Sequence, residues 1–128
     1  MYPENLKYTE SHQWIRVEEG VGTVGITHYG QEKMGNIVYV ELPEKGREVK
    51  KGESFSTLES VKAVFDVPSP VSGKITEVNK SLEDDPSLIN KDPYNRGWLV
   101  KIKISDPSEL DLLLTSGDYE NVVKEEID

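Results

Sequence analysis

The chain has 128 residues, of which 35% are hydrophobic, so it is long enough for one domain with a modest core. Its 24 acidic and 15 basic side chains give a net charge of −9, which argues against nucleic-acid binding, because that requires a clustered basic surface. Cysteine is absent, so the chain has no disulfide, no thiolate nucleophile and no cysteine-based zinc site.

Alternating apolar and polar residues predict a β-rich first half. The expected elements are strands at 14–17, 21–26 and 37–42, and a short helix at 27–33 that Gly35 ends. The run at 20–25 spells G-x-G-x-x-G, which is the dinucleotide-binding fingerprint when it lies between a strand and a crossover helix. The helix that follows is too short for such a crossover. We therefore attribute these glycines to a hairpin and to close strand packing.

The stretch 54–73 reads SFSTLESVKAVFDVPSPVSG and predicts a hairpin with a lysine at its tip. Extended runs at 54–58 and 64–67 flank a tight connection, in which the Ser60 hydroxyl can bond the turn backbone. Two prolines then stop the second strand, because the residue before a proline is held out of the helical region. Lys62 is therefore expected at the tip of a protruding hairpin, with its amine pointing into water.

The remainder of the chain predicts two more strands and a helical end. The expected elements are strands at 73–78 and 98–104, loops and a short helix within 81–90, and helices at 106–117 and 118–128. The first of these last two helices has a capping aspartate and proline at its first position, and Gly117 is expected to end it. We expect a single domain at 1–128, with its core at about 8–105 and C-terminal helices at about 106–128.

Nothing in the sequence resembles a self-sufficient active site. His12 and His28 are the only histidines, and they lack the spacing of a metal site. Ser11 and His12 are adjacent, which would place them on opposite faces of a strand and disfavours a nucleophile–base pair. The acidic pairs at 84–85 and 125–126 lack the apolar surroundings that would separate their pKa values for acid–base catalysis.

The string ESVKA at 59–63, followed by SPVSG at 69–73, closely resembles the lipoyl-attachment hairpin of the glycine cleavage H-protein family. The match extends through GNIVYVELP at 35–43, EVN at 77–79 and PYNRGW at 93–98, and it covers about residues 8–119. The resemblance implies a mainly β fold, a lipoyl- or biotinyl-carrier-like barrel-sandwich hybrid of two small sheets with short helices and a C-terminal helical segment.

The resemblance also implies a carrier, not an enzyme, with lipoic acid in amide linkage to Lys62. In this family the arm receives an aminomethyl group from the pyridoxal-phosphate glycine decarboxylase. The aminomethyltransferase passes the one-carbon unit to tetrahydrofolate, and the FAD-dependent dihydrolipoyl dehydrogenase reoxidises the dithiol with NAD. Lipoylating enzymes are further implied partners.

The expected setting is a monomer in the cytoplasm that binds neither nucleic acid nor a membrane. No apolar run in the sequence approaches membrane-spanning length. The first residues, MYPEN, resemble neither a secretory signal nor an amphipathic presequence.

Several residues match positions to which the family gives a role. Glu59 and Gly73 match positions associated with recognition by lipoylating enzymes, and Ser60 belongs to the same hairpin. A solvated acid and a turn glycine are the alternative interpretations of the first two. The family also shelters the loaded arm in a cleft near an aspartate, which is Asp66 here.

The family's Ser-His-Glu-Trp segment lies beside that cleft and reads SHQW at 11–14 in this chain. Ser11 is retained, but glutamine replaces the glutamate at position 13. Gln13 can accept a hydrogen bond yet supplies no charge for an ammonium group.

Three alternative carriers differ in how well they fit this chain. A lipoyl domain of a 2-oxoacid dehydrogenase complex would have Asp-Lys-Ala at the tip, an Ala/Pro-rich linker and a catalytic domain, whereas this chain has Val-Lys-Ala. A biotinyl carrier would have methionine on both sides of its lysine. An H-like adaptor that relays lipoate to other proteins would have the same hairpin, so the sequence leaves that alternative open.

Overall fold

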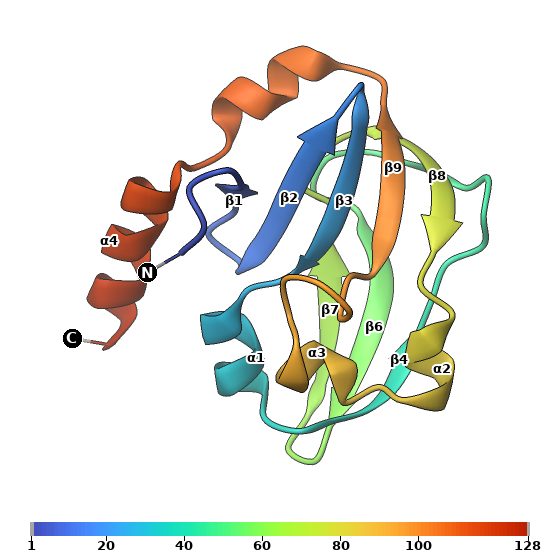
Figure 1. The fold of residues 1–128 in the computed structure, drawn as a ribbon, viewed down its shortest axis with the longest axis vertical. Coiled ribbons are helices and arrows are strands. Elements are labelled where there is room, and N and C mark those ends of the chain that lie inside the picture. Colours follow the sequence, from blue (N-terminus) through green and yellow to red (C-terminus); the bar gives the residue numbers. More distant parts are fainter. Residues whose placement is uncertain (1, 128) are drawn as a thin grey trace.

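The computed structural model describes residues 2–127 and consists of two antiparallel β-sheets packed face to face, with short helices at their edges (Figure 1). The strands are β1 (Lys7–Tyr8), β2 (Gln13–Glu18), β3 (Val21–Ile26), β4 (Ile37–Glu41), β5 (Glu48–Val49), β6 (Ser54–Ser60), β7 (Val64–Pro68), β8 (Gly73–Val78) and β9 (Val100–Ile104). The helices are α1 (His28–Met34), α2 (Ser81–Asp84), α3 (Leu88–Lys91), the 3₁₀ helix η1 (Pro107–Leu112) and α4 (Ser116–Ile127). The six-stranded sheet has the order β1-β2-β3-β9-β8-β5, and the three-stranded sheet has the order β4-β6-β7. The predicted fold class is confirmed.

A cluster of apolar side chains fills the space between the two sheets. Val40, Leu58 and Phe65 are partners across the three strands of the smaller sheet and share its inner face. Ile75 and Ile102 are partners in the larger sheet and belong to the same cluster. Because side chains alternate along a strand, a slip of one residue would turn this apolar row toward solvent, and the cluster therefore fixes the register of the hairpin.

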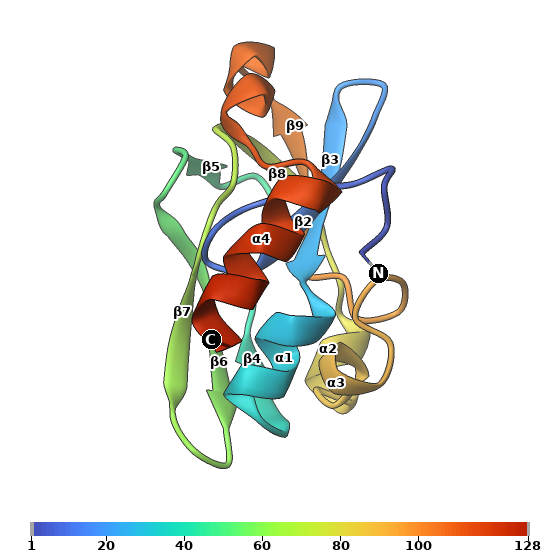
Figure 2. The same ribbon diagram turned by 90° about the vertical axis from the view of Figure 1, so that its left-hand side faces the viewer.

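A second apolar cluster holds α4 against the N-terminal residues. The rings of Tyr8 and Tyr119 stack with centroids 4.8 Å apart and planes 9° apart, and Trp14 and Val123 are buried in the same cluster. The backbone N–H of Tyr8 also donates to the Leu114 carbonyl at 2.9 Å. These contacts place α4 beside α1 and close to β7, as Figure 2 shows.

The hairpin strand β6 extends further than the sequence predicted. It continues to Ser60, because Glu59 pairs with Tyr39 on one side and with Val64 on the other. The two-residue strands β1 and β5 were not predicted, whereas β3 and β8 have the predicted bounds. The hairpin is therefore longer, and its connection tighter, than the pattern indicated.

The prediction that Gly117 ends a helix is wrong. The 3₁₀ helix η1 already ends at Leu112, and Gly117 lies inside α4. The reason is a hydroxyl cap that the periodicity did not reveal, since Thr115 Oγ1 accepts the backbone N–H of Asp118 at 3.2 Å.

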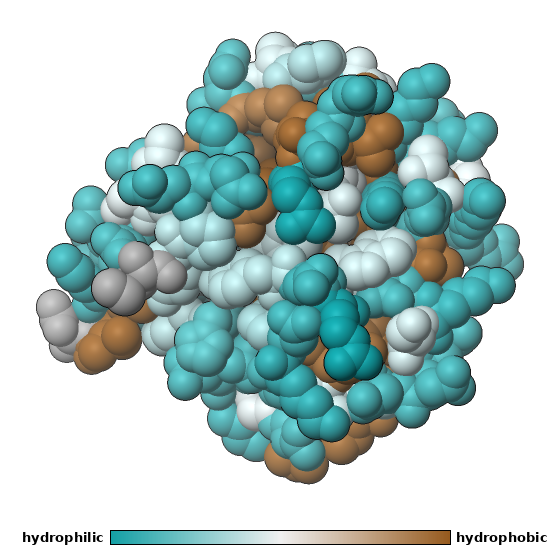
Figure 3. Space-filling model, viewed as in Figure 1, coloured by the Kyte–Doolittle hydropathy of each residue, from teal (hydrophilic) through white to brown (hydrophobic). Residues whose placement is uncertain are grey.

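The face seen in Figure 3 is mostly hydrophilic, with a hydrophobic patch at its lower edge, where Figure 1 places the tip of the hairpin. Val61 in the hairpin turn is 68% exposed. Among residues 2–127, no helix combines the length and the apolar character needed to cross a bilayer.

Gly73 begins β8 with no room for a side chain, and this predicts a large effect of the smallest substitution. A Cβ at this position would clash with the carbonyl oxygen of Lys103 on the neighbouring strand. We predict that Gly73→Ala lowers the free energy of unfolding by about 2 kcal/mol, as overpacking does, measured by urea denaturation. Gly117→Ala is the control, because that position is open and alanine favours helix. Equal stabilities of the two variants would contradict the packing argument.

Candidate functional site

Ser60 organises the turn at the projecting end of the β6–β7 hairpin (Figure 1). Its Oγ accepts the backbone N–H groups of Lys62 at 3.0 Å and of Ala63 at 3.2 Å. Its own backbone N–H donates to the Ala63 carbonyl at 2.9 Å. The hydroxyl thus closes the turn in the way that the sequence predicted.

Lys62 lies at the tip of the hairpin and is exposed, as predicted. Its amine does not point only into water, however. Lys62 Nζ donates to the backbone carbonyl of Lys33, in the last turn of α1, at 3.0 Å. The expectation of a freely solvated amine is therefore corrected, because the end of α1 lies within reach and presents unsatisfied carbonyl groups.

The two residues matched to lipoylation recognition lie in different sheets. Glu59 is exposed on the outer face of the three-stranded sheet, in one cross-strand row with Tyr39 and Val64. Gly73 is buried in the six-stranded sheet and pairs with Ile104. The structure therefore brings Glu59, but not Gly73, to the hairpin that carries Lys62.

A cleft of about 620 Å³ opens between β7, the segment before β2, α1 and the end of α4. Its lining includes the three residues expected from the sequence, Ser11, Gln13 and Asp66. Apolar side chains from β7 and α1 complete part of the wall. The lining contains the thioether of Met34 but no thiol.

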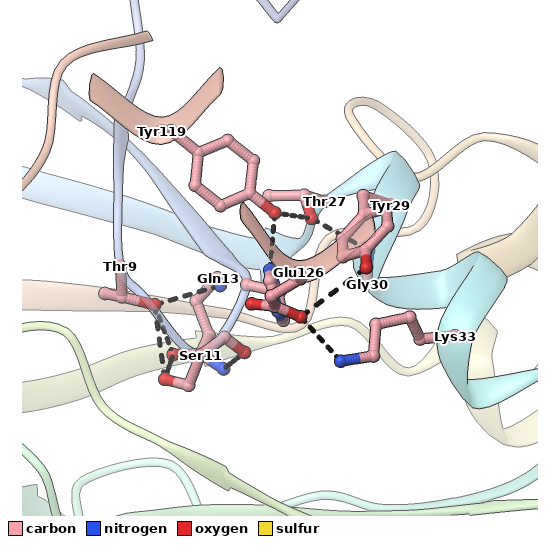
Figure 4. A network of polar contacts seen from close by, with 10 residues as sticks. Thr9, Ser11, Gln13, Thr27, Tyr29, Gly30, Lys33, Tyr119 and Glu126 are labelled. Atoms are coloured by element: carbon pink, nitrogen blue, oxygen red, sulfur yellow. Dashed lines mark hydrogen bonds and ion pairs between the residues drawn. The ribbon is translucent and has the colours of Figure 1, made fainter. Parts of the chain in front are cut away.

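The side chain of Gln13 forms its hydrogen bonds within its own loop (Figure 4). It is 2% exposed, and its Oε1 accepts the hydroxyl groups of Thr9 at 2.7 Å and of Ser11 at 2.8 Å. Its Nε2 donates to the Ser11 carbonyl at 2.7 Å. A carboxylate at position 13 has no hydrogen to donate to that carbonyl, so the amide suits this loop geometry.

A directed chain of hydrogen bonds connects α1 to α4 beside the cleft (Figure 4). Glu126 lies 2.9 Å from His12 Nε2, and His12 Nδ1 lies 2.7 Å from the Tyr119 hydroxyl. That hydroxyl lies 2.6 Å from Thr27 Oγ1, which accepts the backbone N–H of Gly30 at 3.0 Å. Because an ionised carboxylate only accepts, the hydrogen of neutral His12 is on Nε2. Nδ1 then accepts from Tyr119, and Tyr119 accepts from Thr27.

Lys33 completes this chain with a salt bridge of 2.6 Å to Glu126. The hydrogen bond from Lys33 lowers the pKa of the Glu126 carboxyl, and the same bond raises the pKa of Lys33. Two other carboxylates line the cleft, Glu10 and Asp66, and neither forms an ion pair within residues 2–127. The cleft therefore retains negative charge even though position 13 is neutral.

The sequence did not indicate His12, Lys33 and Glu126 as cleft residues. His12 and Glu126 are 114 positions apart, and no local pattern indicates that they meet. Within the described part of the chain, no three His, Asp or Glu side chains form a group able to hold a metal ion.

Burial lowers the pKa of His12, and this predicts a loss of stability in mild acid. The unfolded chain binds a proton near the ordinary histidine pKa of about 6.5, whereas the folded chain does so only at lower pH. The free energy of unfolding should therefore fall as the pH drops below about 6.5, by at most about 1.4 kcal/mol per pH unit for this group. Urea denaturation between pH 7.5 and 5 measures the slope.

His12→Asn is the matched variant for this test. The backbone at His12 has a φ of 73°, which asparagine tolerates, and the Asn Oδ1 replaces Nδ1 as an acceptor for Tyr119. The variant should flatten the slope between pH 5 and 6.5. An unchanged slope would assign the acid sensitivity to other groups.

Comparison with known proteins identifies one family over almost the whole chain. A family model described as glycine cleavage H-protein matches residues 6–126. The glycine cleavage system H protein of Symbiobacterium thermophilum is 52% identical over 123 residues, covering 96% of each chain. That of Thermotoga maritima is 54% identical over 120 residues, covering 94% of this chain and 97% of the relative. The crystal structure of a glycine cleavage system H protein from Mycobacterium marinum superposes with a TM-score of 0.89 at 39% identity, covering 96% of this chain and 99% of that one. The chain therefore belongs to the glycine cleavage H-protein family, the lipoyl carriers of the glycine cleavage system.

Proposed function

We propose that Lys62 carries lipoic acid as an amide, and that the protein presents this arm to the enzymes of glycine cleavage without catalysing a step itself. The observation that carries the proposal is an exposed lysine at the tip of a hairpin whose turn Ser60 closes. Membership of a lipoyl-bearing family supports the choice of group. When bound, lipoate supplies the disulfide and dithiol chemistry that accepts and releases the aminomethyl group of glycine.

Such an arm is long enough to reach the cleft. About eleven bonds separate the Cα of Lys62 from the dithiolane ring, which corresponds to roughly 13 Å when extended. Asp66 lies four residues further along the hairpin, which is at most roughly 13 Å at the rise of a β-strand, because β7 begins only at Val64. An arm folded back along β7 would therefore reach Asp66 in the cleft.

The lining of the cleft fits the two ends of a loaded arm. Val64, Phe65 and Met34 offer apolar contacts to a dithiolane ring and its aliphatic stem. Asp66, which accepts a hydrogen bond from Thr57 at 3.2 Å, offers a carboxylate to the ammonium group of an aminomethyl adduct. Gln13 contributes shape and not charge, because its polar atoms are used within its own loop.

The proposed partners are those that the family implies: the pyridoxal-phosphate glycine decarboxylase, the aminomethyltransferase with tetrahydrofolate, dihydrolipoyl dehydrogenase with FAD, and lipoylating enzymes. The proposal includes a cytoplasmic location, where tetrahydrofolate and NAD are available to these enzymes. It also treats the chain as one carrier unit, because α4 from the C-terminal end supplies Glu126 to the cleft.

Replacing the attachment lysine tests the carrier function directly. Protein made in cells that synthesise lipoate should gain the mass of one lipoyl group, and Lys62→Arg should gain none, because the guanidinium does not form the amide. Intact-mass spectrometry measures both. With the three partner enzymes, only the modified protein should support glycine-dependent NADH formation. Unchanged mass in both proteins would contradict lipoylation, whereas lipoylation without NADH formation would favour the lipoate-relay alternative.

Asp66 is the residue with which to test the cleft. We predict that Asp66→Asn releases the aminomethyl group from the loaded arm about two- to fivefold faster, since one partly exposed carboxylate–ammonium pair contributes about 0.5–1 kcal/mol. The measurement is the spontaneous release of ammonia from the isolated loaded protein. Glu41→Gln is the matched control, because Glu41 lies in the same cross-strand row as Asp66 but outside the cleft. Equal release rates for the two variants would contradict a role for Asp66.

A further inference from the structure

The tip of the hairpin rests on the loop that follows α1. Beyond the strand pairing of β4 with β6, the backbone N–H of Val61 donates to the Asn36 carbonyl at 3.1 Å. The next residue, Lys62, donates its amine to the Lys33 carbonyl at 3.0 Å. Two consecutive hairpin residues are thus held by the segment 33–36, which we call the tip seat.

Gly35 lies in the tip seat directly under the lysine side chain. A Cβ at Gly35 would lie 2.8 Å from Lys62 Cε, so the stem of the lysine crosses this position at contact distance. Gly35 also has a φ of +84°, which side-chain-bearing residues rarely adopt. The backbone therefore requires glycine at this position, and a Cβ here would also push the flexible end of the lysine side chain out of its place on the tip seat.

Asn90, on α3, fixes the tip seat from the other side. Its Nδ2 donates to the Gly35 carbonyl and to Gln31 Oε1, each at 2.9 Å, and its Oδ1 accepts the backbone N–H of Ile37, also at 2.9 Å. Both amide hydrogens and the amide oxygen are therefore used. Aspartate lacks the donors and alanine lacks all three groups, so neither can replace this clamp.

We propose that Asn90 and Gly35 are positioning residues for the lipoylation of Lys62, because they order the tip seat that holds the lysine and its turn. This inference rests on the proposed function. A lysine that is already ordered on its turn costs the modifying enzyme less conformational entropy to bind than a mobile one. Asn90 acts through the tip seat and has no contact with the lysine itself.

The geometry is compatible with the chemistry of amide formation. A neutral amine has two hydrogens and one lone pair, so Nζ can donate one N–H to the Lys33 carbonyl and keep the lone pair for attack. With a lipoyl adenylate as acyl donor, the lone pair forms the C–N bond at the lipoyl carbonyl, the C–O bond to AMP breaks, and the surplus proton passes to solvent. No oxidant or reductant is needed.

The test measures modification by a lipoate–protein ligase with lipoic acid and ATP, followed by intact-mass spectrometry at a temperature where every variant is folded. We expect Asn90→Ala and Asn90→Asp to lower kcat/KM for the carrier about three- to tenfold, corresponding to the loss of one or two hydrogen bonds. Hydrogen exchange of the Val61 amide should become faster in both variants, because its acceptor is on the tip seat. A general loss of stability would not single out this amide.

Two glycine variants compare the position under the lysine with a position of positive φ that lies away from it. Gly35→Ala and Gly52→Ala both place a side chain on a backbone with positive φ, at +84° and +86°, but an alanine at position 52 would meet no atom within 4 Å. We expect Gly35→Ala to lower kcat/KM by a similar three- to tenfold factor and Gly52→Ala to leave it within twofold. This pair keeps the test decisive if the Asn90 variants do not fold.

The outcomes are distinguishable from failure of the proposed function. If the wild-type protein is not lipoylated, the proposed function fails. If the wild type is modified and the Asn90 variants match its kcat/KM, or the two glycine variants behave alike, the positioning inference is overturned while the carrier function stands.

Discussion

The presentation of Lys62 depends on the burial of one face of the three-stranded sheet. Leu58 lies in the middle of that sheet, is inaccessible to solvent and is flanked in register by Val40 and Phe65. Because this row is packed against the larger sheet, the base of the hairpin cannot slide or twist without exposing apolar surface. The projecting turn is therefore attached to a rigid base, and the Ser60 hydroxyl group closes the turn. A rigid base with an exposed end is what a carrier of a long side chain requires.

The cleft beside the hairpin is assembled from segments that are remote in the sequence. The C-terminal helix contributes Glu126, which binds His12 from the N-terminal segment and Lys33 from α1. Asp66 comes from the hairpin strand that follows the lysine. Folding of the two ends of the chain onto each other is therefore a condition for the cleft, whereas the lysine tip requires only the hairpin and its neighbours. The stability of the α4 contact and the integrity of the cleft should accordingly be coupled.

Short-range sequence patterns predicted those elements whose conformation depends on neighbouring residues, such as the hairpin. Alternation and turn chemistry indicated the hairpin around Lys62, and residue matches to the family indicated Ser11 and Asp66, which the structure places in one cleft. The sequence did not predict the amine's bond to Lys33 or the clamp by Asn90, because each joins segments separated by 29 or more positions. It also misplaced a helix boundary at a glycine, where a threonine hydroxyl cap decided the outcome.

The absence of sulfhydryl groups from the cleft wall, and from the whole chain, has a redox consequence. A dithiol tethered to Lys62 would have no intramolecular cysteine with which to exchange, so mixed disulfides could form only with another molecule. Electrons would then leave the arm solely at an encounter with an external acceptor. The redox state of such an arm would therefore be set entirely by the partner molecules that it meets.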